Sequence, residues 1–214
     1  MFDEFDFSAL ITGSGPGSEC SVVIIEPGMS RDLQEQFHIL RYRSFGQWEG
    51  TDPQIGKECD RYDPYSTAIL VVWEGIVIAG CRLIDGEQIG VTLDSIPFDS
   101  GRHFEISRML IRSEVKDRAT RDRVMFALCQ AVAEYAFEER GYDDLYCDTR
   151  LPFYVALSRI FEESLEQIGP EHDVKKKGKT LTLVPTRIRS TSVPAMRQHF
   201  MRRLQPQKAA LEPA

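Results

Sequence analysis

The strongest constraint on the fold is a pair of apolar segments that a tight turn joins near the middle of the chain. Residues 66–73 (STAILVVW) and 76–85 (IVIAGCRLID) are rich in β-branched side chains, and Glu74-Gly75 alone separates them. Segments of this composition form strands, and a two-residue connection ending in glycine favours an antiparallel hairpin. The sequence therefore predicts a hairpin as part of a central sheet.

Strand-like and helix-like segments alternate along the rest of the chain. Between two strand-like segments, residues 120–140 place their apolar side chains on one stripe and end at Gly141, as helices do. The order predicted is strand 21–26, helix 30–45, irregular segment 46–64, strands 66–73 and 76–85, strand 104–111, helix 120–140, strand 143–149, helix 151–169 and strand 179–186. This order is typical of an α/β or α+β sandwich around a mixed sheet.

Composition divides the chain into three parts. Its 214 residues, 42% of them apolar, suffice for one domain with a sizeable core. Residues 1–20 are aperiodic and end in a Gly/Ser-rich stretch, which predicts a flexible N-terminal extension. The folded domain is expected over 21–186, and 187–214 is expected to be a basic tail. That tail is either a solvated end or a docking surface for an acidic partner.

Composition also bears on location and ligands. The formal net charge is −7, and an acidic domain is poorly suited to binding nucleic acid. No segment approaches the ~20 apolar residues of a membrane span, and the N-terminus carries acids where a secretion signal has basic residues. The five cysteines include no CxxC pair, which signals neither a disulfide framework nor a zinc site. We therefore expect a cytoplasmic protein without a metal, with buried, inert thiols favoured over a catalytic thiolate.

Charged and aromatic residues stand at particular spacings between residues 40 and 108. An arginine and a phenylalanine lie four apart in LRYRSF, a tryptophan follows, and then come a DxxD motif in ECDRYD, an arginine in GCRLI and an ExSR motif in FEISR. Together these motifs resemble the LuxI-type acyl-homoserine-lactone synthases, and the element order resembles the Gcn5-related acyltransferase fold. The residues that carry the resemblance are Arg41, Phe45, Trp48, Asp60, Asp63, Arg82, Glu105, Ser107 and Arg108.

Several features depart from that family. Trp48 follows Phe45 more closely than is usual, GCRL lacks one residue before Arg82, and Ile96 takes a place usually held by Phe. The segment IRSEVKDRATRDR also lacks the Gly-rich turn with which acetyl-coenzyme A enzymes hold a pyrophosphate. Backbone amides at the start of the following helix could still bind a phosphate-bearing carrier. The shape of the small-molecule pocket therefore stays open.

The resemblance implies an acyltransferase-like α/β/α sandwich with a mixed, mostly antiparallel sheet, and a reaction in two steps. The amine of S-adenosylmethionine attacks an acyl thioester that acyl-carrier protein or acyl-CoA delivers. The substrate carboxylate then closes on the γ-carbon and expels methylthioadenosine, which gives an N-acyl-homoserine lactone, a quorum-sensing signal, without any cofactor. Because the amine is protonated at neutral pH, acylation needs a base. Glu105 is the candidate base and Asp63 the next, although Glu105 could instead pair structurally with an arginine.

The charged residues of the motifs balance in sign. Three arginines and three acids could form one ion-pair network: Arg41, Arg82, Arg108, Asp60, Asp63 and Glu105. Arg41 and Arg108 are also candidates for anchoring the substrate carboxylate, because a guanidinium offers two parallel donors. Phe45 and Trp48 either hold the sulfonium against an aromatic face or form a hydrophobic lid.

Strand periodicity raises a difficulty for FEISR. In a regular strand Glu105 and Ser107 face one side and Arg108 faces the other. A β-bulge would be needed to bring Glu105 and Arg108 together. The sequence therefore links a shared role of these two residues to an irregularity in the strand.

The acyl chain needs an apolar slot between the sheet and the later helices. Thr149 lies at a position with which the family senses the acyl β-carbon, so a β-oxo group could be bound. The candidates for the wall of the slot, all equally plausible as plain core, are Met109, Phe126, Tyr146, Leu151 and Phe153.

Two other functions fit the same residues. One is an N-acyltransferase of the same fold that acts on a free amino acid or another amine, and the other is a catalytically silent acyl-carrier-binding module. An acidic carrier protein would be expected to dock near the start of the helix over 120–140, where the basic residues are Arg112, Lys116, Arg118, Arg121 and Arg123. The sequence predicts neither the acyl chain nor the oligomeric state.

Overall fold

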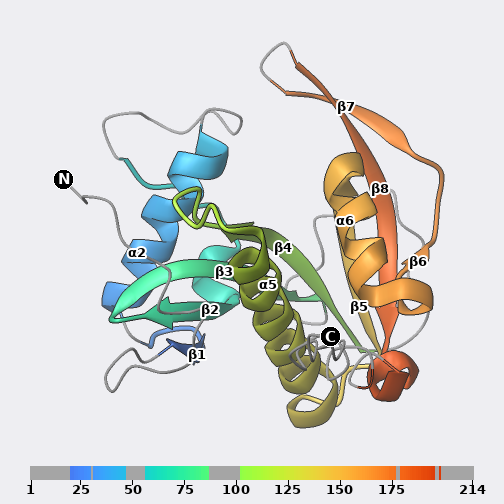
Figure 1. Cartoon of the computed structure of the whole chain (residues 1–214), viewed down its shortest axis with the longest axis horizontal. Helices are drawn as coiled ribbons and strands as arrows, with labels where there is room; N and C mark the ends of the chain where they lie inside the picture. The colour runs from blue at the N-terminus through green and yellow to red at the C-terminus, as the bar shows by residue number, and fades with distance from the viewer. Residues whose placement is uncertain are drawn as a thin grey trace, which may run out of the picture.

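A computed structural model of the chain describes residues 20–29, 31–46, 56–86, 102–176, 179–195 and 198 (Figure 1). The helices are α2 (Arg31–Arg41), α5 (Arg118–Ala133) and α6 (Leu151–Phe161). The strands are β1 (Cys20–Ile25), β2 (Thr67–Trp73), β3 (Ile76–Asp85), β4 (His103–Ile111), β5 (Asp144–Arg150), β6 (Glu166–Gln167), β7 (His172–Lys176) and β8 (Lys179–Arg189). π-Helical segments extend α2 over Tyr42–Gly46 and α5 over Glu134–Glu139, and 3-10 turns cover Asp63–Tyr65, Glu162–Ser164 and Ser190–Ser192. Within these ranges no helix is long and apolar enough to span a membrane.

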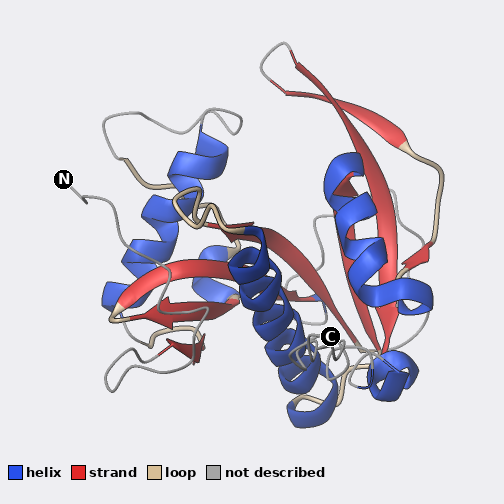
Figure 2. Ribbon diagram, in the orientation of Figure 1, coloured by secondary structure: helices blue, strands red, loops and turns tan. Residues whose placement is uncertain are grey.

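The strands form one mixed sheet. Their order is β1-β2-β3-β4-β5-β8-β6, and β7 pairs with β8. Among the described strands every pair is antiparallel except β4 with β5, which is parallel. The predicted mixed, mostly antiparallel sheet is therefore confirmed. Figure 2 shows α6 lying along β5 and β8, in the second half of the sheet.

The predicted hairpin forms β2 and β3. Trp73 pairs with Ile76 across the turn, and both turn residues have positive φ, 49° at Glu74 and 77° at Gly75. Two positive φ values define the type I′ turn, whose twist matches that of the flanking strands. Local sequence is therefore sufficient to specify this pair.

Helices cover both faces of the hairpin. Along β2, which is buried at every position, Ile69 and Val71 belong to the core cluster that α5 covers, and Leu70 belongs to the cluster that α2 covers. Gly80 of β3 allows α2 to approach, because a Cβ there would lie 2.6 Å from Leu70 Cδ2 and 2.9 Å from Phe37 Cε2. The layers are therefore α/β/α, as expected.

β4 and β5 diverge after a short run of pairing. Their last pair is Glu105 with Tyr146. Beyond it β4 bulges, because Arg108 has a φ of 56° and both Arg108 and Met109 lie opposite the single residue Cys81. A bulge bends and twists its strand, and in Figure 1 the two strands separate toward the top of the view. The bulge that FEISR was expected to need is thus present, and it opens a split in the sheet.

The C-terminal third differs from the prediction. The helix expected over 151–169 ends at Phe161 and a 3-10 turn, and β6 follows. The Glu166 carboxylate in β6 pairs with Arg187 at 3.0 Å, so pairing with β8 overrides helical periodicity. β7 was not predicted, and β8 continues to Arg189, so Arg187 lies buried in the sheet rather than in a tail. Nearly all of the expected N-terminal extension and most of the expected tail lie outside the described residues.

Candidate active site

Six charged side chains form a closed ring of alternating sign beside β4. In order around the ring they are Arg41, Glu58, Arg108, Asp60, Arg82 and Asp63. Arg108 Nη2 lies 2.9 Å from Glu58 and 3.6 Å from Asp60, and Arg82 Nη1 lies 2.6 Å from Asp60. The network has the composition that the motifs suggest, three cations and three acids, except that its third acid is Glu58.

Four segments of the chain meet in this ring. Arg41 ends α2, Arg82 lies in β3 and Arg108 lies in the bulge of β4, whereas the three acids come from the irregular segment before β2. A backbone hydrogen bond from Glu58 N to the His38 carbonyl (3.1 Å) fastens that segment to α2. The ring therefore depends on the packing of α2 and of the irregular segment on the sheet.

The ring is buried on one side and open on the other. Arg41 is 0% exposed and Glu58 1%, whereas the side chains of Arg108 and Asp60 are 21% and 28% exposed. Burial alone would lower the pKa of Arg41, but hydrogen bonds to Glu58 and Asp63 raise it above its ordinary value. Arg41 thus serves as a structural cation. The other arginine suggested as a carboxylate anchor is Arg108, and its side chain is accessible at the open side of the ring.

Sequence reasoning missed Glu58, although it belongs to the ECDRYD segment. Glu58 precedes Asp60 by two residues, and side chains two apart share a side of an extended segment. That spacing is the signal that could have identified Glu58, because a second acid on the same side as Asp60 would reach the same cations.

Glu105 and Ser107 of β4 have different surroundings. Arg82 Nε donates to Ser107 Oγ at 3.0 Å, which fixes the ring to β4. Glu105 is 3% exposed and is the last residue of β4 that pairs with β5. Burial, and to a lesser degree the charge of Glu105, raises the pKa of Cys147 to about 12. Cys147 and Ile106, the residue after Glu105, both line the cavity described next, so Glu105 lies close to that cavity.

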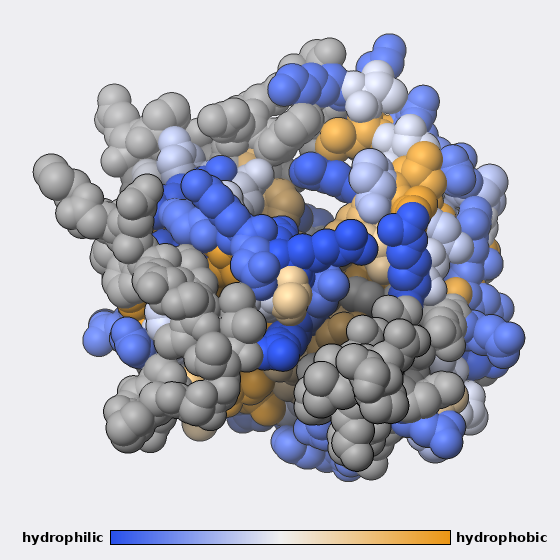
Figure 3. All heavy atoms as spheres, in the orientation of Figure 1, coloured by the Kyte–Doolittle hydropathy of each residue, from blue (hydrophilic) through white to orange (hydrophobic). Residues whose placement is uncertain are grey.

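An apolar cavity opens beside the split between β4 and β5. It holds about 370 Å³ of empty space, its mouth included, and β4, β5, α6 and β8 supply its walls. In Figure 3 a hollow lies near the centre of this face, bordered by hydrophilic side chains and, toward α6 and β8, by hydrophobic ones. The lining residues are Ile106, Met109, Leu145, Cys147, Phe153, Leu157, Phe161, Leu165, Thr186 and Ile188.

Two of the five residues expected in the acyl slot, Met109 and Phe153, line this cavity. Phe126 is instead a core residue of α5, and Leu151 is partly buried at the start of α6. Tyr146 is fully buried but lies on the other face of β5, since its two neighbours in sequence face the cavity. The remaining wall residues depend on how β5 pairs with β8, which no local pattern encodes.

Thr149 lies just behind the cavity wall. Its Oγ1 donates to Cys147 Sγ at 2.9 Å and is 3.5 Å from Thr186 Oγ1, and both of these neighbours line the cavity. A hydroxyl is therefore close to the acyl slot, and its role toward the acyl β-carbon stays a prediction.

The Phe45 ring lies between two guanidinium groups. Arg108 Cζ is 5.8 Å and Arg150 Cζ is 5.7 Å from its centroid. These cation–π contacts link the helical segment after α2 to both sides of the split. The aromatic face suggested for a sulfonium is thus already in contact with arginines. Trp48 lies outside the described residues, so its role stays a prediction.

A carboxylate caps the start of α5. Asp117 accepts hydrogen bonds from Thr120 N (2.7 Å) and Thr120 Oγ1 (2.8 Å). Free backbone amides at a helix start attract phosphate, but here one of them is taken and a negative charge stands beside it. The phosphate site considered from sequence is therefore disfavoured.

The five basic residues expected to dock a carrier fall into two groups. Arg112 is buried and its Nε donates to a backbone carbonyl of β3 (3.2 Å), and Arg121 Nη1 donates to a carbonyl of the segment before α5 (3.0 Å). These two arginines stabilise the connection between β4 and α5. Lys116, Arg118 and Arg123 are exposed on the surface.

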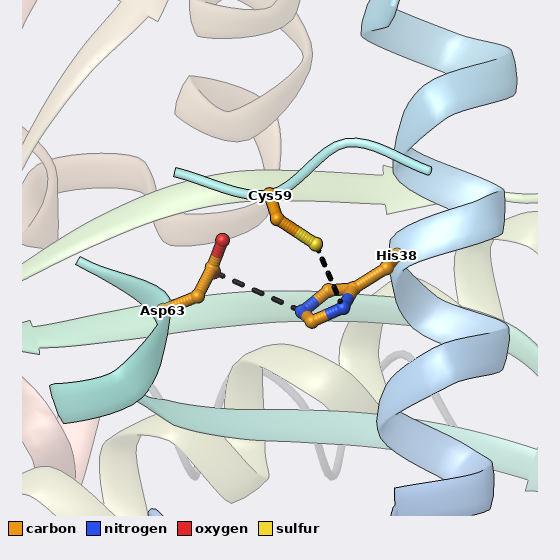
Figure 4. A group of neighbouring side chains, drawn as sticks. All are labelled: His38, Cys59 and Asp63. Carbon is orange, nitrogen blue, oxygen red and sulfur yellow. Dashed lines mark hydrogen bonds and ion pairs between the residues drawn. The ribbon is translucent and has the colours of Figure 1, made fainter. Parts of the chain in front are cut away.

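Three potential metal ligands, His38, Cys59 and Asp63, lie together on the α2 side of the ring (Figure 4). Cys59 Sγ is 3.1 Å from His38 Nδ1, and Asp63 Oδ1 is 4.0 Å from His38 Nε2. Cys59 is exposed, and Asp63 is also a member of the ring. This group was not predicted from the sequence, because Cys59 has no partner cysteine at metal-binding spacing.

No family model and no curated protein sequence matches the chain at a significant level. Solved structures do match. The acyl-homoserine lactone synthase LasI is similar with a TM-score of 0.68 and 20% identity, over 81% of this chain and 91% of its own. The CoA-dependent acyl-homoserine lactone synthase BjaI, solved with S-adenosylmethionine and isopentyl-CoA, is similar with a TM-score of 0.65 and 18% identity, over 86% and 90%.

A related enzyme with another product is also similar. FeeM, an N-acyl amino acid synthase from uncultured soil microbes, has a TM-score of 0.63 and 13% identity, over 87% of this chain and 96% of its own. Identities this low establish the fold and leave the substrate open. The chain therefore has the fold of the acyl-homoserine lactone synthases and of related N-acyltransferases, as its motifs and element order predicted.

Proposed function

We propose that this chain is an acyltransferase that acylates the amine of S-adenosylmethionine and closes the product to an N-acyl-homoserine lactone. One observation carries the proposal. Adjacent residues of β4 belong to two sites: Met109 lines the apolar cavity and Arg108 forms the open edge of the charged ring, and the buried Glu105 stands where β4 and β5 part. An apolar slot beside a charged site suits the transfer of a fatty acyl group to a charged amine.

The two sides of the split match the two substrates. After Glu105 and Tyr146 no further pair joins the described parts of β4 and β5, so the facing backbone edges can bind an extended thioester arm as an added strand would bind. On the ring, Arg108 offers an accessible guanidinium to a carboxylate, and Asp60 offers an accessible carboxylate to a cation.

The chemistry needs one proton acceptor and no cofactor. Glu105 takes a proton from the ammonium, the free amine forms a C–N bond with the thioester carbonyl carbon, and the C–S bond breaks to release the thiol. A carboxylate oxygen of the substrate then attacks its γ-carbon, and the C–S bond to neutral methylthioadenosine breaks. Both leaving groups are activated in the substrates. We expect the reaction to take place in the cytoplasm, where both substrates are made.

Carrier protein is the acyl donor that the surface favours. Asp117 occupies the start of α5 where the phosphates of coenzyme A would otherwise bind, whereas Lys116, Arg118 and Arg123 present positive charge beside it. An acidic carrier protein is complementary to such a surface.

Methylthioadenosine release is the decisive measurement. Incubation with S-adenosylmethionine and a series of acyl-carrier proteins and acyl-CoAs should release it together with an acyl-homoserine lactone detectable by mass spectrometry. The likeness to FeeM makes N-acylation of a free amino acid the second candidate, which would give an acyl amino acid and no methylthioadenosine. An absence of turnover on any thioester would instead support a silent carrier-binding module.

A further inference from the structure

We propose that His38, Cys59 and Asp63 form a zinc-binding site on the α2 side of the charged ring. Their donors are an imidazole nitrogen, a thiol sulfur and a carboxylate oxygen, all within 4.8 Å of one another. Zinc takes these three donor types in tetrahedral sites and keeps a fourth position for water where three protein ligands are present. The exposure of Cys59 gives water access to that position.

The separation of Cys59 and His38 is close to that of two ligands on one metal ion. With bonds of about 2.3 Å to sulfur and about 2.0 Å to nitrogen, two ligands on a tetrahedral zinc lie about 3.5 Å apart. Cys59 Sγ and His38 Nδ1 are 3.1 Å apart, so a small rotation of the exposed Cys59 side chain makes room. An imidazole binds one metal ion through one nitrogen, and in His38 this is Nδ1, the nitrogen beside the Cys59 thiol. The Asp63 carboxylate now lies near Nε2, so it has to move toward the zinc position to become the third ligand.

The fold holds the first two ligands together without a metal. His38 is a residue of α2, and Cys59 belongs to the irregular segment 21 residues later. The hydrogen bond from Glu58 N to the His38 carbonyl fastens one segment to the other directly beside Cys59. The site therefore exists in the folded chain and is lost on unfolding, so that bound zinc should raise the melting temperature.

The third ligand couples this site to the ring. Asp63 Oδ1 accepts hydrogen bonds from Arg41 and Arg82, and Oδ2 accepts from Arg41 and the backbone of Asp60. A carboxylate has about four lone-pair sites, and these four bonds use them. A bond from zinc to Asp63 therefore displaces one of these four donors, three of which are arginine N–H groups of the ring. Ring and metal compete for the same carboxylate, and their coupling is reciprocal.

The test uses the full-length chain with Co²⁺ as a spectroscopic probe and Zn²⁺ as competitor. We expect one Co²⁺ per chain, a thiolate-to-cobalt charge-transfer band, and displacement of that band by Zn²⁺. Cys59→Ser should abolish the band, and His38→Gln should weaken binding more than about tenfold. The matched control is Cys20→Ser, which alters another exposed thiol and should keep the band and the affinity of the parent.

Two results would overturn the site: a parent chain that binds no Co²⁺, or a band that survives in Cys59→Ser. Melting curves without metal establish that each variant is folded, and the conclusion rests on Cys59→Ser because that side chain is exposed. One further expectation rests on the proposed function: Zn²⁺ should inhibit acyl transfer by the parent but not by Cys59→Ser. Equal inhibition of both would overturn the coupling between the zinc site and the charged ring. A chain without acyltransferase activity would refute the proposed function while the Co²⁺ titration still decides the site.

Discussion

Glu58→Gln tests whether the charged ring holds the fold around the site. The glutamine keeps the size of the side chain and removes the charge that bridges Arg41 and Arg108. Arg41 is completely buried, so no water can replace the lost carboxylate. Asp63 still contacts Arg41 at 2.5 Å, and the accessible Arg108 can turn toward solvent.

The magnitude follows from burial. Breaking a buried ion pair costs about 3–5 kcal/mol, and the remaining contact between Arg41 and Asp63 puts Glu58→Gln near the lower figure, about 3 kcal/mol. For a domain of this size each kcal/mol lowers the melting temperature by about 2–4 °C. We therefore expect a fall of roughly 6–12 °C.

Thermal unfolding followed by circular dichroism measures this change, and urea unfolding gives the free energy directly. The matched control is Glu35→Gln, which breaks an ion pair with Lys57 on the surface of α2. That pair is solvated, so the control should melt close to the parent. If Glu58→Gln melts as close to the parent as Glu35→Gln does, the ring does not stabilise the fold and the reasoning from burial is refuted.

Four further outcomes are expected. Glu105→Gln should lower the rate of acylation at saturating substrates by about a hundredfold or more while the melting temperature changes little, and higher pH should partly restore the rate; a near-parent rate would make Glu105 a structural carboxylate. Arg118→Glu should slow turnover with acyl-carrier protein and spare a short thioester mimic in rate measurements at several salt concentrations, and an indifferent variant would move docking elsewhere. Leu157→Trp should fill the cavity and shift the products toward shorter acyl chains by mass spectrometry; unchanged products would place the acyl chain outside it. Burial raises the pKa of Asp63, but hydrogen bonding and charge from Arg41 outweigh burial and lower that pKa below its usual value. The contribution of Asp63 to stability is therefore present above about pH 4 and is lost as pH falls through the folded pKa. Acid unfolding of Asp63→Asn should lack this loss, and identical acid-unfolding profiles of variant and parent would contradict the prediction.

Local pattern was sufficient for most elements of the sheet. The Glu74-Gly75 turn, the strand over FEISRMLI and the helix stopped by Gly141 were predicted within a few residues of their observed bounds. The irregularity that FEISR needed is also present at Arg108. Such features depend on neighbours in sequence, through alternation of side chains, turn chemistry and helix stops.

The errors in the C-terminal third have the opposite origin. Apolar spacing after Phe161 favours a continued helix, yet Glu166 pairs with Arg187, and β6 and β7 both pair with β8. These pairings join segments far apart along the chain, and their free energy outweighs the weak local preference for helix.

The candidate site divides in the same way. The sequence by itself singled out the candidate residues of the site, because arginines and acids at fixed spacings on α2, the irregular segment, β3 and β4 stand out without a structure. Tertiary structure alone decided that Glu58 closes the ring, that Glu105 lies where β4 and β5 part, and that Cys59 meets His38. The physical reason is that a buried charge is tolerated only beside its partner. Which partner that is depends on how four separate segments pack, and no local periodicity encodes that packing.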